Sequence, residues 1–291
     1  MDQSPESQYE NVPENASEQG SAFMHPESAP AAVDRDVFGN VPKRHTDWSH
    51  RRGEPRVFTL LWMVYLMGAT VLMFSSMATA YSISPEITRP AARSMLMVIV
   101  IGLSVLWPMV RFSQRQVGHV EFTGQSHVGS AIRDGLVLFI PMQAVLWPQA
   151  MGVLAGWPIE VVSAISALLF GWIVILGGVI ALGCASIERN KGKESIRVVW
   201  MVLVMLIVFG APLVGSVNGM GASVGVDRPR VGWLLSPVTG LLEIVRDRRE
   251  LGTSARVFIE QWRLIIALVC VGSALLLLAR ASEVARSKYR A

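Results

Sequence analysis

One short polar segment of this sequence contains three residues of types that can bind a metal ion. His119, Glu121 and His127 lie within nine positions of one another, and imidazole and carboxylate groups are ligands that zinc accepts. Their His-x-Glu-x5-His spacing fits no single helical face, however, and the sequence offers no evident fourth ligand. We therefore predict no metal site and expect exposed histidines in a loop.

The remaining reactive groups do not form a catalytic pattern. Cys184 and Cys270 each lie inside an apolar stretch, which argues against a disulfide framework and against a zinc site. The Ser, Thr and Cys residues of these stretches have no His or carboxylate beside them to act as a base. No Gly-x-x-x-x-Gly-Lys-Ser/Thr loop occurs, so we expect no P-loop nucleotide binding. We predict no enzymatic activity, no cofactor and no nucleic-acid partner.

Six apolar stretches form the framework that positions these residues. All 48 charged residues and all five histidines fall outside them. Helices around a soluble core would each show a charged face, whereas these stretches are apolar on every side. The six stretches are residues 57 to 80, 94 to 110, 135 to 156, 161 to 186, 198 to 217 and 264 to 279.

We therefore predict an all-α integral membrane protein with about six transmembrane helices. A helix needs roughly 20 residues to cross a hydrocarbon layer about 30 Å thick, and four stretches meet this length. Stretches 94 to 110 and 264 to 279 are shorter, with 17 and 16 residues. Both are followed by arginines whose long side chains can reach the headgroups, so we interpret both as short spans.

The charge distribution predicts two domains and a topology. Residues 1 to 34 hold seven acidic and no basic residues, and from Arg35 basic residues approach the first span. We predict a disordered tail over residues 1 to 55, with a basic end that either binds an anionic membrane surface or only sets topology. Residues 56 to 291 form the transmembrane domain. With the N-terminus inside, cytoplasmic segments hold 17 Lys and Arg against 9 outside, which favours cytoplasmic termini in the plasma (inner) membrane.

The third stretch contains two prolines and two glutamines. Pro141 and Pro148 each remove a backbone donor, so the helix is expected to kink or break there. Gln143 and Gln149 are candidates to bond the freed carbonyls. Two interpretations stay open, a hinge or polar pathway lining and a simple packing kink. The fourth stretch carries Gly171, Gly177, Gly178 and Gly183, which we assign to close helix packing.

Residues 234 to 247 have the periodicity of an amphipathic helix. Leu234, Val238, Leu241 and Val245 share one side, whereas the opposite side is polar. The polar residues are Ser236, Thr239, Glu243 and Asp247. Ser236 is predicted as the N-cap and Pro237 as the first helical residue. Such a helix, before the last span, is expected to be interfacial or re-entrant.

The string Leu-Leu-Ser-Pro-Val-Thr-Gly-Leu-Leu-Glu-Ile-Val-Arg-Asp at 234 to 247 resembles an element between the fifth and sixth spans of type-2 ABC transporter permeases. That family shares the six-span plan with both termini inside. The motif residues here are Ser236, Pro237, Glu243 and Arg246. Those permeases often carry Glu-Arg-Glu-x-Gly-Thr after span two, where this chain has Gln-Arg-Gln-Val-Gly-His at 114 to 119.

The resemblance implies that the segment from 112 to 134 contacts a separate ATPase subunit. The implied contact residues are Arg115, Gly118, His119, Glu121 and Arg133. The expected function is then the membrane-embedded permease subunit of an ABC-type exporter, in a homodimer or with a second permease. The alternatives are an ion-coupled secondary transporter or channel, or a non-catalytic membrane scaffold. Ion-coupled proteins place ionisable residues within spans, and the six stretches contain none.

Overall fold

The computed structural model describes residues 55–78, 84–113, 126–190, 193–217, 229–247 and 255–290. All of them belong to one compact unit, residues 48–291. The predicted tail, residues 1 to 55, lies outside the described residues except for its last position.

The described residues form helices and connecting turns, without a strand. The long helices are α1 (Pro55–Met77), α2 (Pro85–Ile101), α4 (His127–Leu146), α5 (Ile159–Arg189), α6 (Glu194–Val217) and α8 (Ile259–Arg290). The helix α2 continues through the π-helical turn η2 (Gly102–Leu106) into α3 (Trp107–Ser113), and α4 continues into the 3-10 turn η3 (Trp147–Ala150). A second 3-10 turn, η4 (Val231–Leu235), precedes the short helix α7 (Pro237–Ile244).

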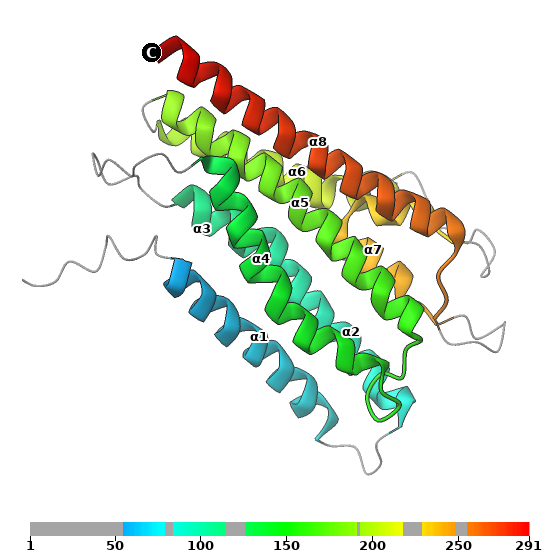
Figure 1. Ribbon diagram of the computed structural model, residues 1–291. Helices are drawn as coiled ribbons and strands as arrows, with labels where there is room; N and C mark the ends of the chain where they lie inside the picture. The colour runs from blue at the N-terminus through cyan, green and yellow to red at the C-terminus, as the bar shows by residue number, and fades with distance from the viewer. Residues whose placement is uncertain are drawn as a thin grey trace, which may run out of the picture. The chain divides into compact units, whose positions relative to one another are not determined.

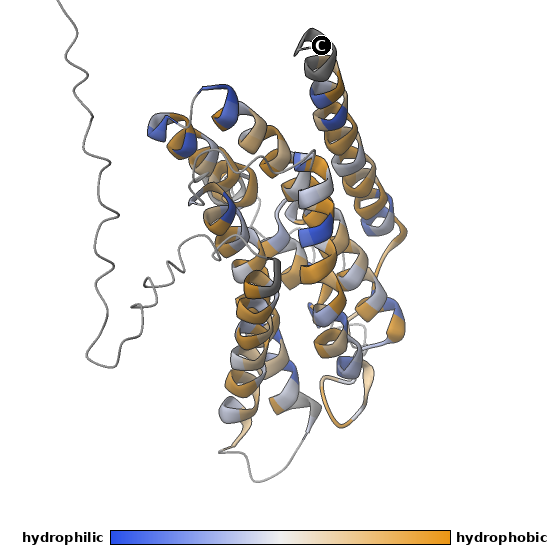
Figure 2. Cartoon of the chain, turned by 60° about the vertical axis from the view of Figure 1, so that its left-hand side comes forward, coloured by the Kyte–Doolittle hydropathy of each residue, from blue (hydrophilic) through white to orange (hydrophobic). Residues whose placement is uncertain are grey.

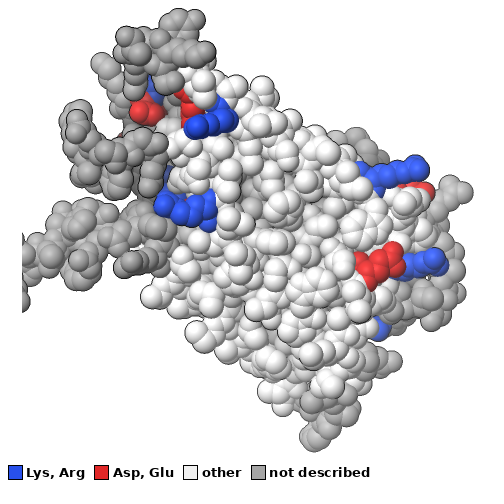
Figure 3. All heavy atoms as spheres, viewed as in Figure 1, with Lys and Arg blue, Asp and Glu red and all other residues white. Residues whose placement is uncertain are grey.

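Six helices in the described part are long and apolar enough to cross a membrane, and they run side by side in Figure 1. The prediction of an all-α membrane protein with about six spans is confirmed. Figure 2 shows apolar residues along the length of these helices and hydrophilic ones near their ends. In Figure 3 the charged side chains of the visible face gather at two ends, with an uncharged surface between them. This distribution matches the apolar interior of a bilayer between two polar surfaces.

The second and sixth spans are longer than predicted. The helices cover Ile87–Ser113 and Ile259–Ala285 as candidate spans, each of 27 residues, whereas the predicted apolar stretches were 94 to 110 and 264 to 279. The length of an apolar stretch shows how many residues suit the hydrocarbon layer. The helix itself can extend beyond that layer, because its backbone hydrogen bonds continue into the polar region. Arg89 and Arg93 therefore lie on a helix and not in a loop.

The third span is displaced from its predicted position of 135 to 156. It begins at His127, where the Ser126 side chain accepts a hydrogen bond from the Gly129 amide at 2.9 Å, and it ends at Ala150. Arg133 and Asp134 consequently lie on the helix of the third candidate span, directly before the uncharged stretch that begins at residue 135.

The helix α5 lies at the centre of the fold, in contact with α3, α4, α6, α7 and α8. Its glycines allow the close packing predicted from the sequence. A Cβ atom at Gly178 would lie 2.8 Å from the Leu275 Cβ, and one at Gly272 would lie 2.8 Å from the Ile175 backbone nitrogen. The seam between α5 and α8 therefore depends on small residues on both helices.

The π-helical turn η2 has a partner on α1. The Tyr65 hydroxyl donates a 2.6 Å hydrogen bond to the Val98 carbonyl, and a Cβ atom at Gly102 would lie 2.3 Å from the Tyr65 ring. The Val98 carbonyl also accepts from the Gly102 amide of its own helix, so Tyr65 is a second donor to it. The tyrosine fits against this turn because residue 102 is glycine.

Candidate functional site

Charged residues gather at both ends of the six-span bundle. We call the end that contains Ser113, His127, Arg189 and Glu194 the pocket end, and the opposite end the α7 end. The predicted motif at 234 to 247 lies at the α7 end, and a cavity lies at the pocket end.

The helix α7 begins as predicted. The Ser236 hydroxyl accepts a hydrogen bond from the Val238 amide at 3.3 Å, and Pro237 occupies the first helical turn. Thr239 donates to the Trp233 carbonyl at 2.6 Å, which ties α7 to η4. Gly240 makes this close approach possible, because a Cβ atom there would lie 3.0 Å from the Leu234 Cα atom.

The polar side of α7 does not face solvent as an interfacial helix would require. α7 packs against α2, α5 and α6, and Glu243 is only 2% exposed. The Glu243 carboxylate accepts hydrogen bonds from the Arg230 amide at 3.1 Å and from Arg246 at 3.3 Å. Buried carboxylates are retained when they are paired in this way. The helix α7 is therefore packed against the spanning helices, with its polar side bonded inside the protein.

Three charged residues join α2 to the end of α7. Arg93 donates to Asp247 at 2.6 Å and to the Val245 carbonyl at 2.6 Å, and Arg89 donates to Asp247 at 3.3 Å. We call Arg89, Arg93 and Asp247 the α2–α7 ion pairs. All three side chains are partly buried.

The same helix, α2, also holds the turn after the third span. The Thr88 hydroxyl donates to the Leu154 carbonyl at 2.6 Å, and Arg89 Nε donates to the Ala155 carbonyl at 3.0 Å. One turn of α2 thus fixes both the 151–156 turn and α7. The α7 end is closed by direct hydrogen bonds between segments distant in sequence.

The two prolines of the third span have different effects. The α-helix runs through Pro141 without a break and changes to a 3-10 turn at Trp147, so the expected break occurs at Pro148. The predicted span end at residue 156 is wrong because the chain turns after Ala150.

The two glutamines bond other carbonyls than predicted. The prolines free the carbonyls of residues 137 and 144, four positions earlier. Gln143 instead donates to the Phe139 carbonyl at 3.5 Å, and its amide oxygen accepts from Ser166 on α5 at 2.8 Å. Gln149 donates to the Val145 carbonyl at 3.3 Å and is 2% exposed. Both glutamines join neighbouring helices, Gln143 through Ser166 on α5 and Gln149 through the Met73 sulfur on α1 at 3.9 Å.

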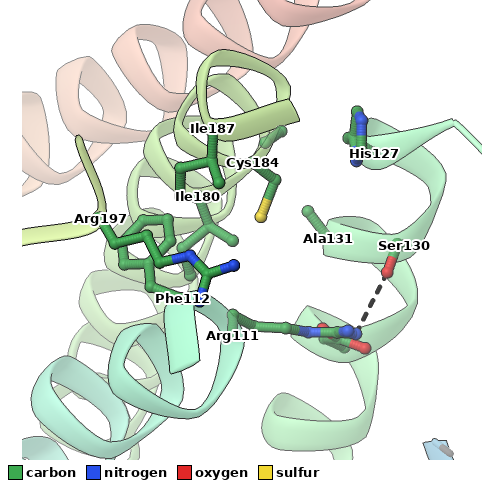
Figure 4. Close-up of a pocket in the computed structure, with 11 residues that line it drawn as sticks. Arg111, Phe112, His127, Ser130, Ala131, Ile180, Cys184, Ile187 and Arg197 are labelled. Atoms are coloured by element: carbon green, nitrogen blue, oxygen red, sulfur yellow. Dashed lines mark hydrogen bonds and ion pairs between the residues drawn. The ribbon is translucent and has the colours of Figure 1, made fainter. Parts of the chain in front are cut away.

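At the pocket end, α3, α4, α5 and α6 enclose a cavity of about 140 Å³ (Figure 4). Its polar lining residues are Arg111, His127, Ser130, Asp134, Cys184 and Arg197. Arg111 pairs with one oxygen of Asp134, Oδ2, and donates to the Ser130 hydroxyl at 3.1 Å. The second carboxylate oxygen, Asp134 Oδ1, is buried and has no hydrogen-bond partner in the described part of the chain.

Arg197 enters the same cavity from the first turn of α6. Its side chain extends toward the space above Arg111, and the Cys184 thiol points into that space from α5 (Figure 4). Within the described ranges the buried Arg197 Nε has no hydrogen-bond acceptor. His127, at the rim, lies 3.0 Å from Glu188. The cavity therefore contains one ion pair, one further guanidinium, and an unbonded donor and acceptor.

Most of the implied ATPase-contact residues lie outside the described residues. These are Arg115, Gly118, His119 and Glu121. Arg133 is described, and it lies on the exposed side of α4, next in sequence to the buried Asp134. His127, considered above as a metal ligand, pairs with Glu188 instead.

Sequence reasoning missed the cavity residues, although a signal exists. His127, Ser130, Ala131 and Asp134 follow the i, i+3, i+4, i+7 spacing of one helical face, and Ser126 precedes them as a cap. Recognising a helix start at 127 would have placed Asp134 on that face. Its pairing with Arg111 on another helix has no sequence signature.

Comparison with known proteins does not identify a family for this chain. No protein-family model, curated protein or solved structure matches the chain.

Proposed function

We propose that this chain is the membrane-embedded permease subunit of an ABC-type exporter that a separate ATPase subunit drives. In this proposal the chain lies in the plasma (inner) membrane, with the pocket end and both termini in the cytoplasm. It acts as a homodimer or beside a second permease. The observation that carries the proposal is the position of α7.

The helix α7 supports a transport role because it inserts between spans and is held there by specific bonds. It carries the motif of Ser236, Pro237, Glu243 and Arg246 on which the family resemblance rests, and it packs against α2, α5 and α6. A helix bonded to several spans moves when they move. A rearrangement of α2 would therefore change the closure of the α7 end through the α2–α7 ion pairs.

The contrast between the two ends agrees with alternating access. Direct hydrogen bonds close the α7 end, whereas the pocket end contains a cavity between four helices. Nucleotide-driven movement of the segment from 112 to 134 would act at α3 and α4, which supply Arg111 and Asp134. The driving force would come from outside the bilayer.

A second candidate, an ion-coupled transporter, gains support from Asp134. This carboxylate is 1% exposed and lies on the helix of a candidate span, and ion-coupled carriers use buried carboxylates on such helices. It ranks second because Arg111 already neutralises Asp134, and this pair lies near the helix ends. Proton-dependent uptake by the purified chain in proteoliposomes would favour this candidate.

Isolation of the full-length chain from its native membrane tests the first candidate. We expect an ATPase subunit with a P-loop to co-purify and to hydrolyse ATP. Arg133→Glu reverses an exposed charge beside the implied contact segment and should reduce the recovered ATPase. Arg189→Glu, an exposed arginine at the same end on α5, is the matched control and should leave recovery unchanged. Recovery of the chain without any ATPase from gently solubilised membranes would contradict the proposal.

A further inference from the structure

The cavity at the pocket end contains polar groups that the fold itself does not use. Asp134 Oδ1 is a buried acceptor, and Arg197 Nε is a buried donor; both are without hydrogen-bond partners in the described residues. Leaving such a group unbonded costs about as much as a lost hydrogen bond. Asp134 is 1% exposed, so bulk water does not solvate its side chain. The two groups indicate a missing bonding partner.

The charge of the cavity favours an anion. Arg111 and Asp134 cancel as an ion pair, and His127 faces Glu188 at the rim. Arg197 has no carboxylate partner among the described residues, and its additional positive charge points into the cavity in Figure 4. Guanidinium groups bind phosphate oxygens with charge-assisted, directional hydrogen bonds.

The unbonded acceptor restricts the choice further. A fully deprotonated anion would be repelled by the Asp134 carboxylate and would leave Oδ1 unbonded. A phosphate that retains a proton, or a phosphodiester with a neighbouring hydroxyl or ammonium group, can bond Arg197 and donate to Asp134 at once. The cavity of about 140 Å³ greatly exceeds the roughly 10–15 Å³ that one water needs, so a group of this size fits.

The position of the cavity matches the depth of lipid phosphates. Arg111 lies in the last turn of α3, and Arg197 and Ser130 lie in the first turns of α6 and α4. The ends of spanning helices meet the headgroup layer that flanks the hydrocarbon. Lipid phosphates and soluble phosphate esters both reach this level.

We propose that the cavity formed by Arg111, Ser130, Asp134 and Arg197 binds a phosphate group, with Arg197 donating to a phosphate oxygen and Asp134 accepting from a donor on the same ligand. The ligand is either the headgroup of an anionic or zwitterionic phospholipid or a soluble phosphate ester. This site is independent of the transport proposal, because it needs neither an ATPase nor a substrate path.

The test measures binding to the purified full-length chain in an uncharged detergent at pH 7. Three probes are used: inorganic phosphate, short-chain phosphatidylglycerol, and inorganic sulfate, which has no proton to donate at this pH. Thermal stabilisation over a concentration series gives an apparent Kd for each. We expect phosphate or phosphatidylglycerol to bind at least tenfold more tightly than sulfate. Binding of the lipid alone identifies the headgroup, and comparable binding of phosphate identifies the soluble ester.

Variants assign the binding to this cavity. Arg197→Gln removes the charge and the Nε donor and should weaken the tighter probe roughly tenfold or more, the usual effect of losing a charge-assisted hydrogen bond. Arg197→Lys keeps the charge without the guanidinium and should give an intermediate loss of affinity. This variant also tests the proposal if Arg197→Gln does not fold. Arg189→Gln removes an exposed charge from the same end and should leave every Kd unchanged.

Three results would overturn the proposal. One is the failure of both phosphate probes to stabilise the wild-type chain. Another is equal binding of sulfate and phosphate, which would assign no role to Asp134. The third is an equal effect of Arg197→Gln and Arg189→Gln, which would mean that the anions bind the surface charge of this end and not the cavity.

Discussion

The two ends of this bundle use charged residues in opposite ways. At the α7 end, Asp247 is bonded by both Arg89 and Arg93, and the same turn of α2 also bonds the 151–156 turn. At the pocket end, Arg111 bonds one oxygen of Asp134, while the other oxygen and the Arg197 Nε have no partner among the described residues that surround a cavity. The first arrangement fixes segments to one another, although the Arg93 Nε is also buried without a partner in the described residues. The pocket end differs because its unbonded groups belong to residues that line a cavity, which leaves bonding capacity for a ligand.

The difference shows that the position of a charge in the sequence does not reveal its role. Arg93 and Arg111 both lie at the borders of the same apolar stretch. Arg93 connects two segments of backbone, whereas Arg111 compensates a buried carboxylate. The following four changes test how separate the two ends are, starting with the largest expected effect.

Replacing Arg111 with Met should have the largest effect on stability. It leaves the Asp134 carboxylate buried without its cation, which costs about 3–5 kcal/mol of unfolding free energy. The double variant Arg111→Met with Asp134→Leu should recover most of this loss, because it removes the uncompensated charge. Reversible unfolding by SDS titration measures both. A double variant no more stable than the single one would show that the ion pair is not the source of the effect.

Replacing Asp247 with Asn should loosen the α7 end. Arg89 and Arg93 lose their shared carboxylate, a cost of about 1.5–3 kcal/mol. Hydrogen exchange of the 238–244 amides should become faster, and that of the first turns of α4 and α6 should not. Combined with Arg111→Met, the losses should add within about 0.5 kcal/mol if the ends are independent. A larger deviation would show that the two ends are coupled through α2 and α3.

Replacing Gly272 with Ala tests the seam that both ends share. The new Cβ atom would lie 2.8 Å from the Ile175 backbone nitrogen, so α8 must move away from α5, at a cost of about 1–3 kcal/mol. Gly210→Ala on α6 is the control, because nothing lies within 4 Å of its Cβ position. The control should be neutral or slightly stabilising when measured by SDS titration. Equal losses in both variants would rule out close α5–α8 packing as the cause.

Replacing Tyr65 with Phe should have the smallest effect. It removes the hydrogen bond from the Tyr65 hydroxyl to the Val98 carbonyl, which lies between the two ends of the bundle. A side-chain hydrogen bond in a membrane protein typically contributes about 0.6 kcal/mol to stability. Exchange rates at the 238–244 amides and at the start of α4 should both stay unchanged. A change at either end would mean that the π-helical turn transmits structural changes along α2.

Much of the fold was predictable because membrane insertion imposes a strong and simple rule. A backbone in hydrocarbon must bond to itself, and its side chains must be apolar, so six apolar stretches predict six helices. The Ser236 and Pro237 start of α7 was predictable as well, because a cap depends on residues close in sequence. The starts of α4 at His127 and of α2 at Pro85 were not predicted. An apolar stretch shows where a chain suits the hydrocarbon layer, whereas these helices begin before their apolar stretches do.

The sequence by itself determined which segments cross the membrane and where α7 begins, since both follow from local side-chain chemistry. The tertiary structure decided what the charges do. The pairing of Arg111 with Asp134, of Arg93 with Asp247, and the entry of Arg197 into a cavity each join residues from different helices. Whether such a group is bonded or left open depends on how neighbouring helices pack, which no single stretch of sequence specifies.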